Sequence, residues 1–415
     1  MEYACASVAL RLRHRRGTSR RFKEELLMKN FRFDRMEAAG SLGDLGTLLP
    51  LAIGMILING LSAASVFFSA GLFYILAGVY FRIPVAVQPM KVIGAYAVTY
   101  GLTPAQIISS SLCMGALLIF LGTTGLIQIL GRIVPGSAIR GVQLSVGVAL
   151  MMKGFDLMAR HDPIFGQHTI GPLSPGLLTG TAGLLITFLL LDNRRTPAAL
   201  VVVGAGFLVG LISKGIPSID LSRTALSLPE LLPYGAPSWD DILWVIPVVV
   251  LPQIPMTIGN AVIANTDLAR EYFGSRAGRT TFRSVSISQG LAGIASFFLG
   301  GIPMCHGAGG LAAHYRFGAR TAGSNVIIGG LFAGFALLLG DNMINLLKLL
   351  PISVLGVLLV FAGSQLAIMI RNLEEKKDYF TAVIILGIAL TSNLGIAFLA
   401  GTILAWLLKS GKFSV

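Results

Sequence analysis

Long apolar stretches, separated by short polar or Gly- and Pro-containing connections, make up most of this chain. We mark fourteen of them, at residues 37–60, 62–81, 85–100, 104–130, 135–158, 174–191, 197–213, 241–264, 282–300, 303–315, 322–340, 344–370, 379–392 and 393–409. A helix needs about 20 residues to cross the hydrocarbon core of a bilayer, so most of these stretches can span a membrane. The third and the tenth are too short to span alone, and we predict that they are half-helices.

Composition supports the same class of protein. Hydrophobic residues make up 54% of the chain and charged residues 12%, whereas about a quarter of the residues of a soluble domain are charged. Polar and apolar positions do not alternate as they do in a membrane β-barrel. The three cysteines are widely spaced and odd in number, which argues against a disulfide framework. The sequence therefore predicts an all-α polytopic membrane protein.

Basic residues give the predicted orientation. If both termini are cytoplasmic, the cytoplasmic connections carry most of the arginines and lysines, as the positive-inside rule requires. The opposite side then keeps only Lys153, Arg160, Lys214, Arg223 and Lys348. We expect a multi-pass protein of the cell (plasma or inner) membrane. The net charge of +13 is then explained by this topology and by anionic lipid headgroups, and no nucleic-acid partner is expected.

The amino terminus differs from the rest of the chain. Residues 1–32 are basic and contain no apolar stretch long enough for a secretory signal, so we expect a disordered cytoplasmic segment. An organellar targeting role stays open. A sharper hypothesis places the start of translation at Met28, because a purine-rich run that resembles a bacterial ribosome-binding site can encode Lys23-Glu24-Glu25. Mass spectrometry of the native amino terminus would decide between these alternatives.

Two landmarks recur at one offset along the chain. Pro303-Met304 lies 214 residues after Pro89-Met90, and Pro351 lies 216 residues after Pro135. Each half would hold seven segments, and an odd number makes the second half enter the membrane from the opposite side. The pattern predicts a 7+7 inverted repeat, with chance spacing of prolines as the alternative.

The two short segments predict a binding site. Each is broken by a Pro-containing motif, Gln88-Pro89-Met90-Lys91 in the first half and Gly301 to Gly307 in the second. The start of a helix presents unpaired N–H groups and the positive end of the helix dipole. Two such ends that face each other in mid-membrane would form a cradle for a small anion.

Several of these motifs carry a family resemblance. Gly43 to Thr47, Val87 to Lys91, Pro252 to Pro255, and Pro303 to Gly310 followed by Tyr315 to Arg320 resemble the molybdate transporter family, a branch of the sulfate permease superfamily. The motifs occur in the expected order and cover nearly the whole chain from about residue 33.

The resemblance implies a fold and a division into domains. It implies the fold of sulfate permeases and nucleobase transporters, in which a gate domain moves against a core domain. We expect a first repeat at 33–213, an external linker at 214–240 and a second repeat at 241–409. Segments 1–4 and 8–11 would form the core domain, and segments 5–7 and 12–14 the gate domain. Relatives suggest a homodimer.

Three ionisable residues near the breaks leave alternatives open. Lys91 could attract a dianion, pair with Asp44 or snorkel to the membrane surface. Asp44 could carry a proton, or it could hold Lys91 or a helix end in place. His306 could donate to an oxyanion or play a structural part. Asp44 and His306 are the candidates for proton coupling.

The complete predicted binding set follows from the two breaks and from polar side chains expected nearby. It consists of Gln88, Pro89, Met90, Lys91, Gln253, Thr257, Asn260, Pro303, Met304, Cys305, His306 and Gly307. Ordinary contacts between helices are the alternative for the uncharged members. Neighbouring helical residues such as Cys305 and His306 point about 100° apart, so we expect no metal and no cofactor.

These observations lead to one predicted function and its rivals. We expect a secondary active transporter that imports molybdate, and also tungstate, by alternating access with proton coupling as a hypothesis. A transporter for sulfate or another oxyanion and an anion channel of the same fold are the alternatives. An enzyme is not expected, because no nucleophile, base and orienting residue occur together at a recognisable spacing and no nucleotide-binding loop is present.

Overall fold

The computed structural model describes residues 31–166, 174–190, 193, 197–215 and 228–410. Most of them are helical. The predicted basic segment therefore lies almost entirely outside the described residues, and so does most of the first half of the predicted linker. The helices of the first half are α2 (Arg35–Ser41), α3 (Leu45–Leu57), α4 (Ala63–Phe81), α5 (Lys91–Tyr100), α6 (Pro104–Thr124), α7 (Ile127–Ile133), α8 (Gly136–Ala159), η1 (Pro163–Phe165), α9 (Pro175–Leu190) and α10 (Ala198–Lys214).

The second half repeats this order of long and short elements. Its helices are α11 (Trp239–Val245), η3 (Ile246–Val250), α12 (Leu251–Met256), η4 (Thr257–Ala264), α13 (Asn265–Phe273), η5 (Gly274–Arg279), α14 (Phe282–Leu299), α15 (Ala308–Arg316), α16 (Gly323–Leu339), η6 (Gly340–Asn342), α17 (Met343–Leu347), α18 (Ile352–Ala367), η7 (Ile368–Asn372), α19 (Lys376–Thr391) and α20 (Leu394–Lys409). Each of the fourteen predicted stretches overlaps one of these helices or a run of them.

Helix length and composition support a membrane-spanning protein. In the described part of the chain, five helices are long and apolar enough to cross a bilayer, and the bent pair α2 and α3 makes a sixth. Four further apolar helices, α9, α10, α16 and α20, have 16 or 17 residues. The count of fourteen segments stays a prediction.

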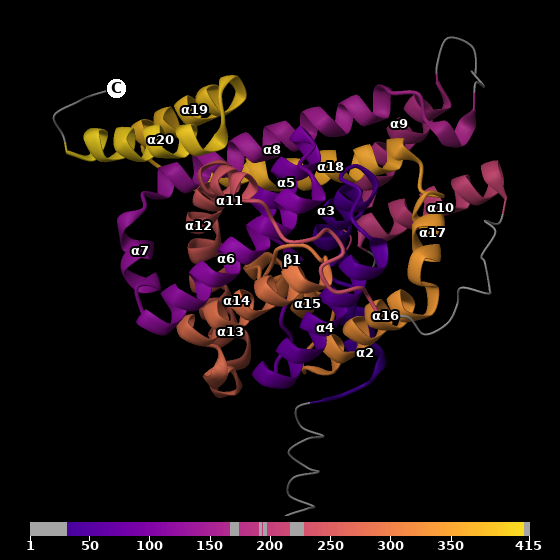
Figure 1. Cartoon of the computed structure of the whole chain (residues 1–415), viewed down its shortest axis with the longest axis horizontal. Coiled ribbons are helices and arrows are strands. Elements are labelled where there is room, and N and C mark those ends of the chain that lie inside the picture. Colours follow the sequence, from indigo (N-terminus) through magenta and orange to yellow (C-terminus); the bar gives the residue numbers. More distant parts are fainter. Residues whose placement is uncertain (1–30, 167–173, 191–192, 194–196, 216–227, 411–415) are drawn as a thin grey trace, which may run out of the picture.

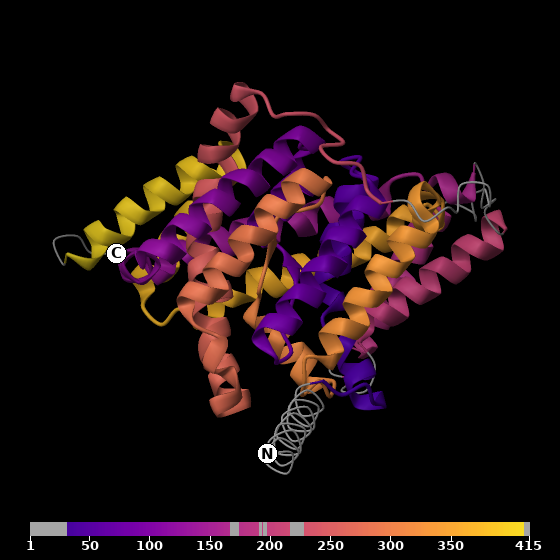
Figure 2. The same cartoon turned by 60° about the horizontal axis from the view of Figure 1, so that its bottom comes forward.

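Pairs of helices pack in a way that reflects the two halves. α16 packs along α4 and α14 packs along α6, while α8 packs along α18. In the repeat, α4 corresponds to α14 and α6 to α16, so the pair α4–α16 corresponds to the pair α14–α6. α8 corresponds to α18, so the third pair corresponds to itself. The pairs α9–α10 and α19–α20 lie at opposite ends of the molecule (Figure 1, Figure 2).

Glycines allow the helices of these pairs to approach closely. A Cβ atom at Gly71 of α4 would lie 2.6 Å from the Gly329 carbonyl oxygen of α16, and a Cβ at Gly115 of α6 would lie 2.9 Å from the Gly290 carbonyl of α14. Small residues at such positions bring backbones together and increase dispersion contacts between membrane helices. The matching glycine contacts in the two pairs are a second sign of the repeat.

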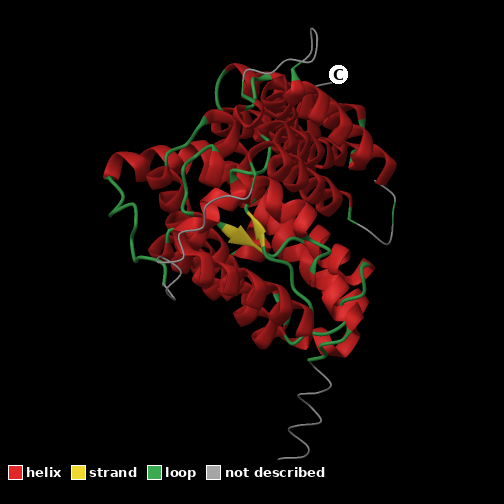
Figure 3. Cartoon of the chain, turned by 90° about the vertical axis from the view of Figure 1, so that its right-hand side faces the viewer, coloured by secondary structure: helices red, strands yellow, loops and turns green. Residues whose placement is uncertain are grey.

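Two very short strands lie at the centre of the helices (Figure 3). β1 (Gln88–Pro89) pairs antiparallel with β2 (Met304–Cys305), with Gln88 opposite Cys305 and Pro89 opposite Met304. One residue, Met90, separates β1 from α5, and two residues, His306 and Gly307, separate β2 from α15. The two broken segments therefore meet at this strand pair, whereas the sequence predicts only that their helix starts face each other.

Candidate substrate-binding site

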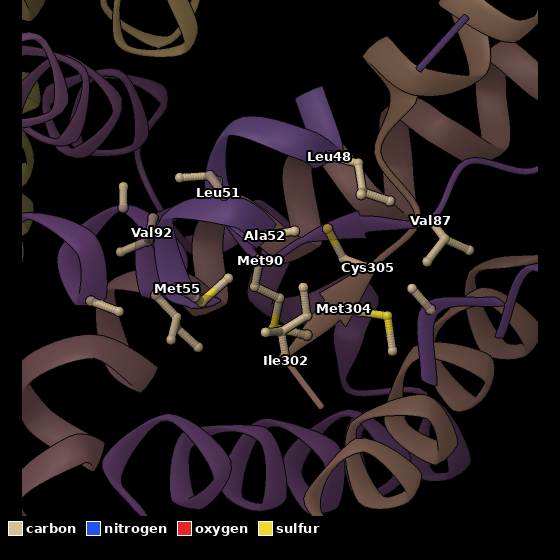
Figure 4. Close-up of a cluster of buried hydrophobic side chains, with 14 of the residues drawn as sticks. Leu48, Leu51, Ala52, Met55, Val87, Met90, Val92, Ile302, Met304 and Cys305 are labelled. Carbon is tan, nitrogen blue, oxygen red and sulfur yellow. The ribbon is translucent and has the colours of Figure 1, made fainter. Parts of the chain in front are cut away.

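The strand crossing fixes the two breaks against each other. The Met90 N–H donates to the Pro303 carbonyl at 2.7 Å. The side chains of Met90, Met304 and Cys305 are buried in an apolar cluster with Leu48, Met55 and Ile302 (Figure 4). These three predicted site residues therefore contribute backbone and packing at the crossing, while their side chains lie among apolar neighbours.

The start of α5 is capped by a side chain from another helix. Gln253 of α12 accepts hydrogen bonds through Oε1 from the N–H groups of Val92 at 2.9 Å and Ile93 at 3.3 Å. Its Nε2 donates to Thr257 Oγ1 at 2.9 Å. Two of the N–H groups that a helix start leaves unpaired are thus satisfied inside the protein. Gln253 is therefore a neutral cap of α5, and Thr257 holds the amide of Gln253 in place.

The start of α15 has no such cap. Its N-cap residue is Gly307, which has no side chain to accept a hydrogen bond, and the Gly307 carbonyl accepts from the N–H groups of Gly310 and Leu311. The Ala308 and Gly309 N–H groups have no acceptor within the helix. Gly309 is exposed, and a Cβ atom added to it would meet nothing within 4 Å. This helix start therefore opens onto free space beside the crossing.

A carboxylate and an amide lie against the same helix start. Gln88 Nε2 donates to Asp44 Oδ1 at 2.5 Å, and both side chains are buried. A Cβ atom at Gly310 would overlap the Asp44 carboxylate and the Gln88 amide, and one at Gly307 would overlap Gln88. The glycines are needed for this close approach. Asp44 Oδ2 and Gln88 Oε1 have no hydrogen-bond partner among the described residues.

Lys91 is the first residue of α5 and is partly exposed. The ion pairs of the described residues join Lys153 and Arg160 to Asp156, and Lys377 to Glu375. A salt bridge between Lys91 and Asp44 is therefore not formed in this conformation. Of the three roles that the sequence leaves open for Lys91, the geometry does not support pairing with Asp44.

His306 is held by the protein on both sides of its ring. Nδ1 lies 2.8 Å from the Ala86 carbonyl and Nε2 lies 3.0 Å from Ser288 Oγ. The ring is tilted against Phe73 and meets Phe81 edge-on. Both ring nitrogens are engaged, so His306 fastens the β2 segment to its neighbours and has no free donor for a ligand.

Asn260 lies on an irregular stretch of the second half. Residues 246–250 and 257–264 are π-helical, and they flank α12, which contains Pro252 and Pro255. π-Helical turns are rare and occur frequently at functional sites. Asn260 is partly exposed, and its neighbour Gly259 faces Ile139 of α8. Its side chain has no hydrogen bond to the described residues and is available to a ligand.

Sequence reasoning missed residues that hold the breaks in place. Asn325 of α16 accepts from the Val85 N–H at 2.9 Å and donates to the carbonyls of Val85 and Tyr74 at 2.7 and 3.3 Å. Asn59 donates to the Ala97 and Leu102 carbonyls at the end of α5, both at 2.8 Å. A single amide side chain inside an apolar stretch could have indicated these residues, because burying an amide without a hydrogen-bond partner is costly.

The described residues contain no group of three or more His, Cys, Asp or Glu side chains that could hold a metal ion. The chemistry of the site is therefore that of backbone N–H groups, amides, one carboxylate and one ammonium group. Such a set can bind an anion through hydrogen bonds and charge.

Comparison of the sequence with known proteins identifies a family. A family model described as "Molybdate transporter of MFS superfamily" matches residues 36–150 and 246–366. Molybdate transporter 2 of Arabidopsis thaliana is 33% identical over 417 residues, which cover 90% of this chain and 87% of that protein. Molybdate transporter 1 of Chlamydomonas reinhardtii is 32% identical, over 88% of this chain and 90% of that protein.

Comparison with solved structures confirms the expected fold. The transmembrane domain of the cyanobacterial bicarbonate transporter BicA superposes with a TM-score of 0.62 at 16% identity, over 90% of this chain and 98% of that one. SLC26A9 superposes with a TM-score of 0.60 at 16% identity, over 91% of this chain and 65% of that one. The architecture is that of sulfate permeases, and the matches in sequence show that this chain belongs to the molybdate transporter family.

Proposed function

We propose that this chain is a secondary active transporter that imports molybdate, and tungstate with it, by alternating access. Relatives about one-third identical over most of the chain are named molybdate transporters, which supports the substrate. The observation that carries the proposal is the start of α15. It is uncapped, opens onto free space and lies beside the crossing of two broken segments.

In the proposed binding mode, the oxyanion lies at the start of α15. The N–H groups of Ala308 and Gly309 donate to two of its oxygens, and the helix dipole favours its negative charge. Lys91, at the start of α5, supplies the positive charge, and Asn260 supplies a neutral donor. All three polar contributions come from groups that are partly or fully exposed or lack an intrahelical acceptor.

The remaining predicted residues position the groups that would contact the anion. Gln253, which is held by Thr257, caps α5 and so orients Lys91. His306 anchors β2. Preorganised donors gain affinity because little conformational freedom is lost when the ligand binds. The residues whose backbone or packing shapes the crossing are Gln88, Pro89, Met90, Pro303, Met304, Cys305 and Gly307.

Import of a dianion requires a driving force. An inside-negative potential opposes each negative charge by about 2.3 kcal/mol per 100 mV, so a dianion is opposed by about 4.6 kcal/mol. We propose that protons enter with the anion and that Asp44 carries one of them. Its carboxylate lies against the helix start that would bind the anion, and protonation would remove the repulsion between the two negative groups. His306 is the weaker candidate, because both of its ring nitrogens are already engaged.

The transport cycle would alternate between two access states. We assign α2–α7 and α11–α16 to a core domain that carries the site, and α8–α10 and α17–α20 to a gate domain, with both termini cytoplasmic. Rocking of one domain against the other would expose the site to each side in turn. A homodimer is part of the same proposal.

Uptake of labelled molybdate into proteoliposomes tests the proposal. We expect saturable uptake that is blocked by unlabelled molybdate and tungstate, weakly reduced by sulfate and unaffected by uracil. Equal competition by sulfate at the same concentration would mean that the protein is a general oxyanion transporter and is not selective for molybdate. Large unitary currents in planar bilayers would mean that the protein is an anion channel and not a carrier.

A further inference from the structure

A groove lies between α4 and α14, and Met304 of β2 forms part of its lining. Its volume is about 390 Å³, within the range of roughly 300–1,000 Å³ that is typical of small-molecule sites. Its wall is mainly apolar and includes Phe73, Leu76, Leu291 and Ala295. Leu76 and Leu291 are 57% and 58% exposed. In a membrane-spanning protein, such a groove faces lipid.

One end of the groove is cationic. Tyr80 and Ser284 line that end. The Arg279 guanidinium lies 5.9 Å from the centroid of the Tyr80 ring and donates to the Tyr80 carbonyl at 2.9 Å. Arg283 directly precedes Ser284 and is exposed. Neither 63–86 nor 275–300 contains an acidic residue, so the charge at this end is not neutralised by a nearby carboxylate in these segments.

The groove is long as well as apolar. Along α14 its lining runs from Ser284 to Leu299, which is about 22 Å at 1.5 Å per helical residue. The hydrocarbon core of a bilayer is about 30 Å thick. The groove therefore extends past the middle of the membrane from its cationic end. On the arginine distribution, that end faces the cytoplasm.

This combination of features selects one kind of ligand. An apolar channel with cations at one end complements a molecule that has a long hydrocarbon chain and an anionic head. Free phosphate would leave the apolar wall unused. A helix from a second copy of the protein, as long as the groove and about 10 Å across, occupies about 1,700 Å³. It is too large to enter the groove and could only contact its edge.

We propose that the α4–α14 groove is a binding site for an anionic phospholipid. One acyl chain lies in the groove between Phe73, Leu76, Leu291 and Ala295. The phosphate lies at Arg279 and Arg283.

The lipid would touch the back of the strand crossing. Met304 belongs both to the lining of the groove and to β2, where it pairs with Pro89. Ser288 also lines the groove, and its hydroxyl lies 3.0 Å from His306 Nε2. An acyl chain at this position would contact β2 through Met304 and would lie beside the hydrogen bond between Ser288 and His306.

Lipid retention measured by native mass spectrometry tests the proposal on the purified full chain. The protein is exchanged into micelles that contain phosphatidylcholine and is then titrated with phosphatidylglycerol of the same acyl chains. We expect one phosphatidylglycerol to be retained at least about tenfold more strongly than phosphatidylcholine, because two arginines near the headgroup each contribute. Inorganic phosphate at the same concentration should not displace it.

Two pairs of variants separate the apolar and the charged parts. Ala295→Trp fills the groove at an exposed position and should abolish retention, whereas Leu208→Trp, on a lipid-exposed face of α10, should not. Arg279→Gln should lower the preference for phosphatidylglycerol about fivefold, and the exposed Arg371→Gln should leave it unchanged. Equal retention of both lipids would overturn the anionic assignment. Retention that survives Ala295→Trp would overturn the groove as its location.

Discussion

The starts of α5 and α15 are equivalent in the repeat and differ in chemistry. α5 begins with Lys91, and its next two N–H groups are capped by Gln253. α15 begins with small residues, has no side-chain cap and opens onto free space at Gly309. The inverted repeat thus supplies two similar backbones, and the side chains make one of them a bearer of charge and the other a donor of hydrogen bonds. A tetrahedral dianion placed between them would need both.

Filling the free space at the start of α15 is expected to have the largest effect. Gly309→Phe should weaken molybdate binding at least about a hundredfold, on the order of 3 kcal/mol, because the ring would occupy the position of the anion. Titration calorimetry on the purified protein measures this. The matched control is Gly330→Phe on α16, another exposed helical glycine with nothing within 4 Å of an added Cβ. Equal loss in both variants would contradict the assignment.

Removing the charge at the start of α5 should have the next largest effect. Lys91→Gln should weaken molybdate binding about tenfold to a hundredfold, since hydrogen bonds to charged groups contribute about 1.5–3 kcal/mol. Lys91→Arg should retain part of the affinity. The exposed Lys348→Gln serves as a control for loss of one positive charge. Unchanged affinity in Lys91→Gln would mean that Lys91 does not contact the anion.

The cap on α5 can be removed without touching α15. Gln253→Leu leaves the Val92 and Ile93 N–H groups unpaired and should lower the free energy of unfolding by about 1–3 kcal/mol. Thermal unfolding in detergent measures this loss. Gln253→Glu keeps an acceptor and should lose less. If both variants were as stable as the natural protein, the cap would not contribute to stability.

Proton coupling gives the last test of the difference between the starts of α5 and α15. Asp44→Asn keeps an acceptor for Gln88 but removes the titratable group. In the natural protein, binding should strengthen as the pH falls, because protonation of Asp44 removes a negative charge beside the anion. In Asp44→Asn, binding should not depend on this protonation, and uptake should no longer respond to a pH gradient. Proteoliposome uptake with and without a protonophore checks this. A gradient response equal to that of the natural protein would exclude Asp44 as the proton carrier.

The sequence by itself determined the elements and the place where they break. Apolar stretches of about 20 residues can only be buried in lipid or in other helices, and Pro89 and Pro303 interrupt two of them at matching positions. The matching breaks also predicted that the two interrupted segments meet, while their pairing as the strands β1 and β2 came only from the structure. These features follow from local composition and spacing, and the chain alone carries that information.

Only the tertiary structure decided which polar side chains face the open space. Gln253 lies 161 residues from Val92, and His306 lies 220 residues from Ala86, so no local pattern shows that they are engaged in holding the breaks. The groove between α4 and α14 has the same origin, because its lining comes from two helices far apart in the sequence and from Met304. Whether a buried polar group is free to bind a ligand depends on its partners, and the fold brings those partners from far along the chain.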